Sequence, residues 1–157
     1  GVSPAISDLH WKTARIPEIN WIAVIAATVA AFIVGFVWFG PKTFYPVWFR
    51  ALGRSPQDSS SVNPAALFVP TIVATFVQAL GVAIVIGLRH GADTHVGPVR
   101  GLLIGGLIGV VFAAAPSLSH RLFAGQGYRV WAIEAGGDVA GLAAMGLVIG
   151  AFNGLSS

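Results

Sequence analysis

Long runs of apolar residues, separated by short polar stretches, dominate the chain. Residues 20–39 and 64–88 contain no charged side chain, and two further apolar runs cover 99–119 and 128–152. Only the last of these runs contains acidic residues. A helix needs about 20 consecutive apolar residues to cross the hydrocarbon layer of a bilayer. The pattern therefore predicts four transmembrane helices, and the connections between them make consecutive helices antiparallel.

Polar segments flank these runs and define the domain organisation. Residues 1–19 form a polar N-terminal arm, 20–152 the four-helix transmembrane domain and 153–157 a short tail. After the first helix, aromatic residues alternate with Lys42 and Arg50, as in an amphipathic segment that lies in the headgroup layer. The expected fold class is an all-α integral membrane protein, an antiparallel four-helix bundle with this arm and this interfacial segment.

Small residues recur at every fourth position in the first and third predicted helices. Residues four apart lie on one side of a helix. A row of small residues therefore leaves the backbone accessible on that side, and a second helix can pack closely against it. The positions expected to pack in this way are Gly101, Gly105, Gly109, Ala113, Ala23, Ala27, Ala31 and Gly35. The alternative interpretation is a surface on which a bound lipid or pigment lies flat against the backbone.

The last helix carries two acidic residues, Glu134 and Asp138, one turn apart in the middle part of the span. An acidic residue at a helix centre costs about 2.5–3.5 kcal/mol on insertion, and two carboxylates at this spacing resist ionising together. We therefore expect hydrogen bonds between this pair and Gln78 or Thr75 of the second helix. Two interpretations stay open: a proton or cation relay, and a structural polar node that fixes helix register or holds a neighbouring subunit.

Composition agrees with a membrane protein and excludes several kinds of site. Of 157 residues, 55% are hydrophobic and 10% charged, whereas about 25% of the residues in soluble domains are charged. The net charge of +3 comes from basic residues at helix ends and in loops, so no nucleic-acid binding is predicted. The chain has no cysteine, and its four histidines do not lie at matched depths inside the spans. We expect no metal site and no haem.

Two parts of the chain resemble a known family. The run from Ile19 to Gly53, with an Asn-Trp start and an aromatic-Gly-Pro end, resembles the opening of the bacterial four-helix membrane family called Domain of Unknown Function 1761. The Arg121-Leu-Phe pattern and the Gly-rich last helix are similar to the same family, so the resemblance extends to about Phe152. It implies a four-helix integral membrane protein and carries over no functional residue. The long arm and the acidic pair depart from the family pattern.

These features predict a non-catalytic accessory or assembly subunit of a larger membrane complex, such as a respiratory or photosynthetic one. More small-residue rows are present than four helices need for each other, and the polar arm offers a further contact. The expected partners are membrane lipids and other integral membrane subunits, with self-association as a second candidate. No phosphate-binding loop or nucleophile elbow is present in the sequence, so no enzymatic activity is expected.

The alternative function is a small homo-oligomeric transporter or channel, coupled to protons or cations through Glu134 and Asp138. Four short helices enclose little volume, so a pathway would form between protomers. For either function the expected location is the bacterial inner (cell) membrane. Four basic residues on the side of the termini against five on the other side favour termini on the non-cytoplasmic side.

Overall fold

The computed structural model describes residues 18–54, 63–90 and 96–153, and the regular structure in these ranges is helical. The predicted polar arm and short tail therefore fall almost wholly outside the described residues. The elements in chain order are α1 (Trp21–Trp38), α2 (Tyr45–Ala51), α3 (Pro64–His90), α4 (Pro98–Ile108), the π-helical segment η3 (Gly109–Ala114), α5 (Ala115–Phe123) and α6 (Gly127–Asn153).

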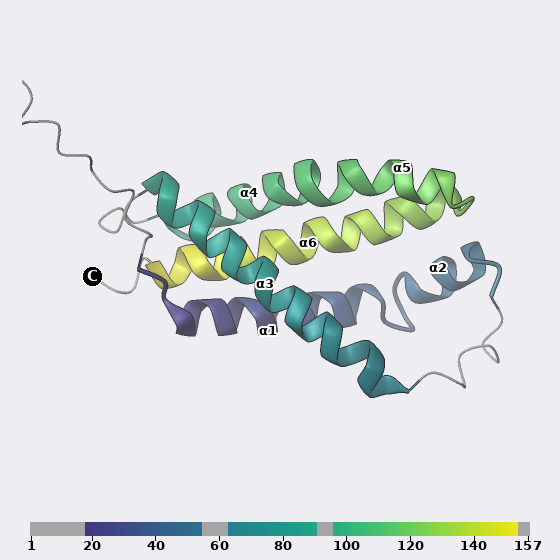
Figure 1. Cartoon of the computed structure of the whole chain (residues 1–157), viewed down its shortest axis with the longest axis horizontal. Helices are drawn as coiled ribbons and strands as arrows, with labels where there is room; N and C mark the ends of the chain where they lie inside the picture. Colours follow the sequence, from purple (N-terminus) through teal and green to yellow (C-terminus); the bar gives the residue numbers. More distant parts are fainter. Residues whose placement is uncertain (1–17, 55–62, 91–95, 154–157) are drawn as a thin grey trace, which may run out of the picture.

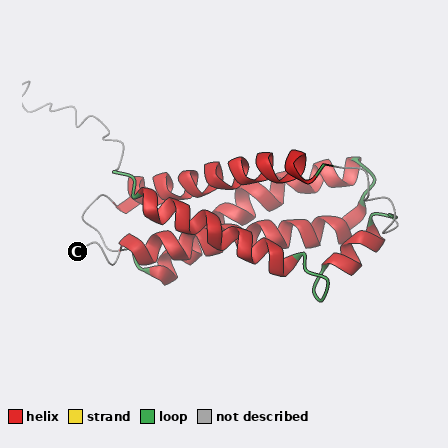
Figure 2. Ribbon diagram, turned by 90° about the horizontal axis from the view of Figure 1, so that it is seen from below, coloured by secondary structure: helices red, strands yellow, loops and turns green. Residues whose placement is uncertain are grey.

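Four helical stretches are long and apolar enough to cross a membrane. They are α1, α3, the continuous run from α4 to α5, and α6. In Figure 1, α6 lies between α4 and α5 on one side and α1 on the other, while α3 crosses the bundle obliquely. Figure 2 shows the same elongated bundle from below. The prediction of an all-α membrane helical bundle is confirmed.

Local sequence signals explain where the first and third spans begin. The side chain of Asn20 caps α1, because its Oδ1 accepts a hydrogen bond from the backbone N–H of Ala23 at 3.1 Å. Gly97, the N-cap of α4, adopts a positive φ of 72°, which glycine tolerates without strain, and Pro98 then opens the helix. Proline suits a first helical turn because the N–H that it lacks has no acceptor there.

The third span is longer than predicted, since helical structure continues past Ser119 to Phe123. Pro116 does not end this span, because it occupies the first turn of α5. The irregularity lies before it, in η3, where the N–H of Ala115 donates to the carbonyl of Val110, five residues back. A π-helical turn of this kind absorbs the missing proline hydrogen bond without ending the span.

The hydrophobic core lies toward the end of the bundle where α1 begins and α6 ends. Its most fully buried members come from α1, α3 and α6: Val24, Ala27, Ala79, Val82, Ile86, Met145 and Ile149. The first part of α3 contributes nothing to this core, because the side chains of residues 65–74 are all exposed. The oblique crossing of α3 explains this asymmetry (Figure 1).

Candidate functional site

The glycine row of the third span packs directly against the backbone of α6. A Cβ atom added at Gly101 would overlap the carbonyl of Gly146, and one at Gly105 would overlap the carbonyl of Leu142. At Gly109 an added Cβ would lie 2.8 Å from the Cα of Val139. The predicted continuation of this row at Ala113 is partly buried against the core. These contacts leave no room for any side chain at the three glycines.

The small-residue row of α1 packs only over part of its predicted length. Ala23, Ala27 and Ala31 are buried. Gly35 is different, because an added Cβ there would meet nothing within 4 Å. The prediction that Gly35 belongs to a close-packed row was therefore wrong. One turn further on, the bulky side chain of Trp38 makes the contact with α6.

The indole of Trp38 lies on a glycine surface of α6. A Cβ added at Gly136 would come within 2.8 Å of the Trp38 ring, and one at Gly137 within 3.1 Å. The indole Nε1 donates a hydrogen bond to the carbonyl of Ile133 at 2.9 Å. The sequence analysis did not predict this contact, although the adjacent glycines on the last helix were a signal that a large ring could be accommodated.

Aromatic contacts then hold the short helix α2 against the end of α1. Trp38 and Phe44 have ring centroids 4.6 Å apart, and Phe39 and Trp48 have centroids 5.6 Å apart. The Thr43 hydroxyl donates to the carbonyl of Trp38 at 2.8 Å and so tightens the turn between the helices. The amphipathic segment predicted after the first helix is therefore a helix whose position allows Trp48 to reach the acidic residue of α6.

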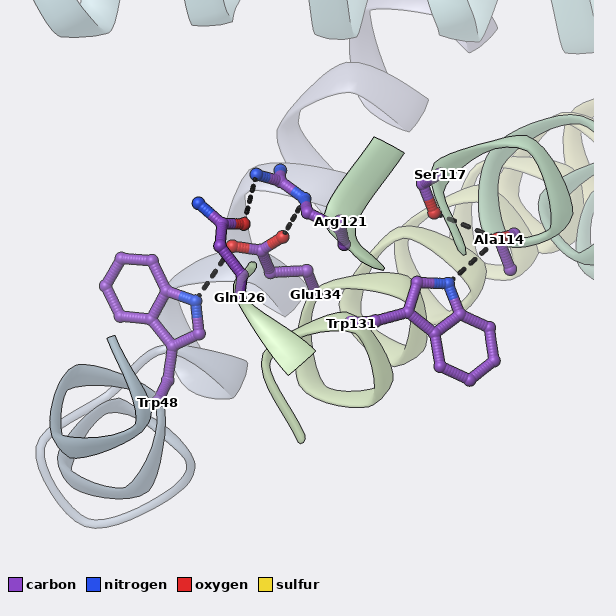
Figure 3. Close-up of polar contacts among 7 residues, drawn as sticks. All are labelled: Trp48, Ala114, Ser117, Arg121, Gln126, Trp131 and Glu134. Atoms are coloured by element: carbon purple, nitrogen blue, oxygen red, sulfur yellow. Dashed lines mark hydrogen bonds and ion pairs between the residues drawn. The ribbon is translucent and has the colours of Figure 1, made fainter. Parts of the chain in front are cut away.

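Glu134 is the centre of a polar cluster that joins three helices (Figure 3). Its Oε1 accepts a hydrogen bond from Nε1 of Trp48 on α2 at 2.9 Å. Its Oε2 lies 2.6 Å from Nε of Arg121 on α5. Arg121 in turn donates from Nη1 to Oε1 of Gln126 at 3.0 Å. We call Glu134, Arg121, Trp48 and Gln126 the polar cluster.

Arg121 and Glu134 form an ion pair without a well-directed hydrogen bond between them. Oε2 of Glu134 is buried and accepts no hydrogen bond from the described residues, although Arg121 Nε is only 2.6 Å away. The Glu134 side chain is 18% exposed and that of Arg121 40% exposed, so the arginine retains part of its hydration. Charge attraction therefore stabilises the carboxylate at a depth where an unpaired charge would be unfavourable.

A second indole reinforces the same end of the bundle. Nε1 of Trp131 on α6 donates to the carbonyl of Ala114 at 3.0 Å, and the Ser117 hydroxyl donates to the same carbonyl at 2.9 Å. Ala114 is the last residue of η3, where the helical hydrogen-bond pattern is irregular. The indole therefore supplies a donor across helices at the position where the third span is locally distorted (Figure 3).

The expected hydrogen bonds from the acidic pair to the second helix are not formed. Gln78 is exposed, and the Thr75 hydroxyl donates to the carbonyl of Thr71 within its own helix at 2.7 Å. The oblique crossing of α3 keeps Gln78 and Thr75 away from Glu134. In addition, threonine hydroxyls readily donate a hydrogen bond to the carbonyl one turn back in their own helix. The partner of Glu134 is instead a basic residue, because the longer third span carries Arg121 to its carboxylate.

Asp138 lies outside the polar cluster. It is exposed on α6, and no hydrogen bond or ion pair to its side chain is found in residues 18–54, 63–90 and 96–153. One turn further along the same face, an added Cβ at Gly141 would meet nothing within 4 Å. The acidic pair is thus divided into a paired residue, Glu134, and an outward-facing residue, Asp138.

Comparison with known proteins gives one result. A family model described as Protein of unknown function (DUF1761) matches residues 22–150. Comparisons with curated proteins and with solved structures give no match. The matched region runs from the first turn of α1 to the last turn of α6 and so includes all four apolar spans. The chain therefore belongs to the DUF1761 family of proteins of unknown function.

Proposed function

We propose that this multi-pass membrane protein is a non-catalytic accessory or assembly subunit that binds another membrane chain through the α6 surface around Asp138. The observation that carries the proposal is the exposure of Asp138 on a transmembrane helix. Exposed apolar residues can contact either lipid or another protein, so they do not indicate which of the two covers a helix. An exposed carboxylate within the hydrocarbon layer is compatible only with polar company.

The depth of Asp138 makes its exposure unfavourable in lipid. Helix α6 has 27 residues and is therefore about 40 Å long, close to the thickness of a bilayer with its headgroups. Asp138 lies two residues from its midpoint, or about 3 Å along the axis. An acidic residue there costs about 2.5–3.5 kcal/mol, which a hydrogen-bond donor or a cation from a neighbouring chain would offset.

The surroundings of Asp138 also suit a second helix. Gly141 has no side chain and open space around its Cβ position, so a partner helix can approach the α6 backbone closely. The apolar spans have between 17% and 33% of their residues buried within the chain, which leaves much side-chain surface for contacts in the membrane. Small residues combined with a polar group are typical of helix association in lipid.

Replacing Asp138 by leucine should separate the protein from its native assembly. We expect the wild-type protein, extracted in mild detergent, to migrate on a native gel at a mass above that of the monomer. Asp138→Leu should shift it to the monomer position, because leucine removes the carboxyl group on which the proposed contact depends. The control is Thr71→Leu, which changes an exposed polar residue of α3 whose hydroxyl already bonds within its helix. Migration of Asp138→Leu with the wild-type complex would contradict the proposal.

The second candidate is a homo-oligomeric proton- or cation-coupled transporter or channel, supported by the outward position of Asp138 one turn from Glu134. In this case purified protein in liposomes should carry a proton or cation flux, and Glu134→Gln combined with Asp138→Asn should abolish it. The two amide variants preserve side-chain shape while removing the titratable groups. Flux that persists in the double variant, or its absence from the wild-type protein, would exclude this candidate and leave the assembly proposal unaffected.

A further inference from the structure

An open groove of about 620 Å³ lies between α2 and the start of α6. Arg50 comes from α2, while Gln126, Tyr128 and Arg129 come from the beginning of the last span and the turn before it. Val47 contributes apolar surface. Among the residues that the structure describes, no acidic side chain lines the groove beside the two arginines.

The groove lies at the level of the lipid headgroups. It includes the first turn of α6, and a 27-residue helix of about 40 Å places its first turn in the polar layer of a bilayer. Helix α2, its other wall, carries Arg50 in its last turn and the exposed residues Tyr45 and Val47. This mixture of basic and apolar groups is typical of helices that lie in the membrane interface.

The positive charge of the groove is not neutralised by the rest of the described chain. The acidic residue nearest in sequence, Glu134, is already paired with Arg121. Arg50 uses its Nε for the carbonyl of Pro46 at 3.0 Å, which fixes the side chain and leaves its terminal guanidinium nitrogens for other acceptors. No hydrogen bond or ion pair of the Arg129 side chain is found within the part of the chain that the structure describes.

We propose that this groove binds the phosphate group of an anionic phospholipid. Arginine presents paired N–H donors that match phosphate oxygens, and the two arginines on opposite walls can contact one phosphodiester together. The Tyr128 hydroxyl and the Gln126 amide are further donors on the lining. Basic pockets between transmembrane elements recognise anionic headgroups by this chemistry.

The position of the groove favours a lipid over a soluble phosphate compound. A lipid phosphate bound here would hold its glycerol and acyl chains beside Val47, which is 43% exposed, and along the exposed apolar faces of the spans. Gln126 also connects the groove to the polar cluster, because its Oε1 accepts from Arg121. A bound anionic lipid should therefore stabilise the bundle as well as occupy the groove.

The test uses the full chain purified in neutral detergent. Thermal unfolding and native mass spectrometry are measured with added phosphatidylglycerol, phosphatidylcholine or inorganic phosphate. We expect phosphatidylglycerol to raise Tm and remain bound, with little effect of the other two. The double variant Arg50→Gln/Arg129→Gln should weaken phosphatidylglycerol binding at least about tenfold, because each arginine supplies charge-assisted hydrogen bonds. Its Tm in phosphatidylcholine verifies that it folds.

The matched control is Arg100→Gln, which removes an exposed arginine from the start of α4, away from the lining of the groove. It should bind phosphatidylglycerol like the wild-type protein. The proposal would be overturned if phosphatidylglycerol and phosphatidylcholine raised Tm equally. It would also be overturned if Arg100→Gln weakened phosphatidylglycerol binding as much as the double variant does. An equal Tm increase with inorganic phosphate at the same concentration would show a site for soluble anions and would also overturn it.

Discussion

Replacing Gly105 by alanine is expected to destabilise the bundle strongly. The added Cβ would overlap the carbonyl of Leu142, which belongs to the backbone of α6 and has no rotamer through which to move away. Helices α4 and α6 would have to separate along their whole contact. Overpacking of this kind typically lowers the free energy of unfolding by about 1–3 kcal/mol, and leucine at this position should prevent folding.

The neighbouring glycine provides a matched control. A Cβ added at Gly106 would lie 3.8 Å from the Cβ of Ala143, an ordinary contact distance. Gly106→Ala should therefore be neutral or should stabilise the helix by up to about 1 kcal/mol through its higher helix propensity. Both variants can be compared by titration with a denaturing detergent, followed by tryptophan fluorescence. Equal stability of Gly105→Ala and Gly106→Ala would contradict the close contact between α4 and α6.

The second large effect is expected from Arg121→Leu. This change leaves the Glu134 carboxylate without its ion-pair partner at a side-chain exposure of 18%. Loss of one partner of a buried pair costs about 3–5 kcal/mol, and we expect the low end because the Arg121 side chain is 40% exposed. The free energy of unfolding should therefore fall by about 3 kcal/mol. The same detergent titration measures it.

A double variant separates the ion pair from the packing of its side chains. Replacing both charges in Arg121→Leu/Glu134→Leu should recover most of the lost stability, because no unpaired charge remains in the apolar surroundings. The residual loss is the Trp48 hydrogen bond to Glu134, worth about 1 kcal/mol. Arg54→Leu, at an exposed arginine before the second span, should change stability by less than about 0.5 kcal/mol. A double variant as unstable as Arg121→Leu would contradict this account of the polar cluster.

The two ends of the bundle are stabilised by different interactions. Toward the start of α1 and the end of α6, small and branched apolar side chains form the core, and helices approach backbone to backbone. At the other end, indole rings of α1 and α2 and an ion pair from α5 join these helices to α6. The proposed lipid groove adjoins this polar end. Stability there should depend on lipid composition more than stability at the apolar end does.

The candidate site was only partly predictable, and its individual residues show why. Glu134 and Asp138 were found because an acidic residue in an apolar run is conspicuous, and the glycine row because its spacing matches one side of a helix. The interactions of Glu134 were not found. Arg121 lies beyond residue 119, where the predicted third helix ends, whereas η3 allows the helix to continue. Trp48 was one of the aromatic residues of the predicted amphipathic segment, but nothing in the sequence indicates that this segment brings it to Glu134.

The sequence by itself determined the number of spans, their helical character and the sides on which helices can approach closely, because hydropathy and periodicity act within one helix. The tertiary structure alone decided which residues meet across helices: Arg121 with Glu134, Trp38 with Gly136, and no close neighbour for Gly35. Those contacts depend on crossing angles and on where each helix ends. Both result from the packing of all spans together, so local pattern along one segment does not encode them.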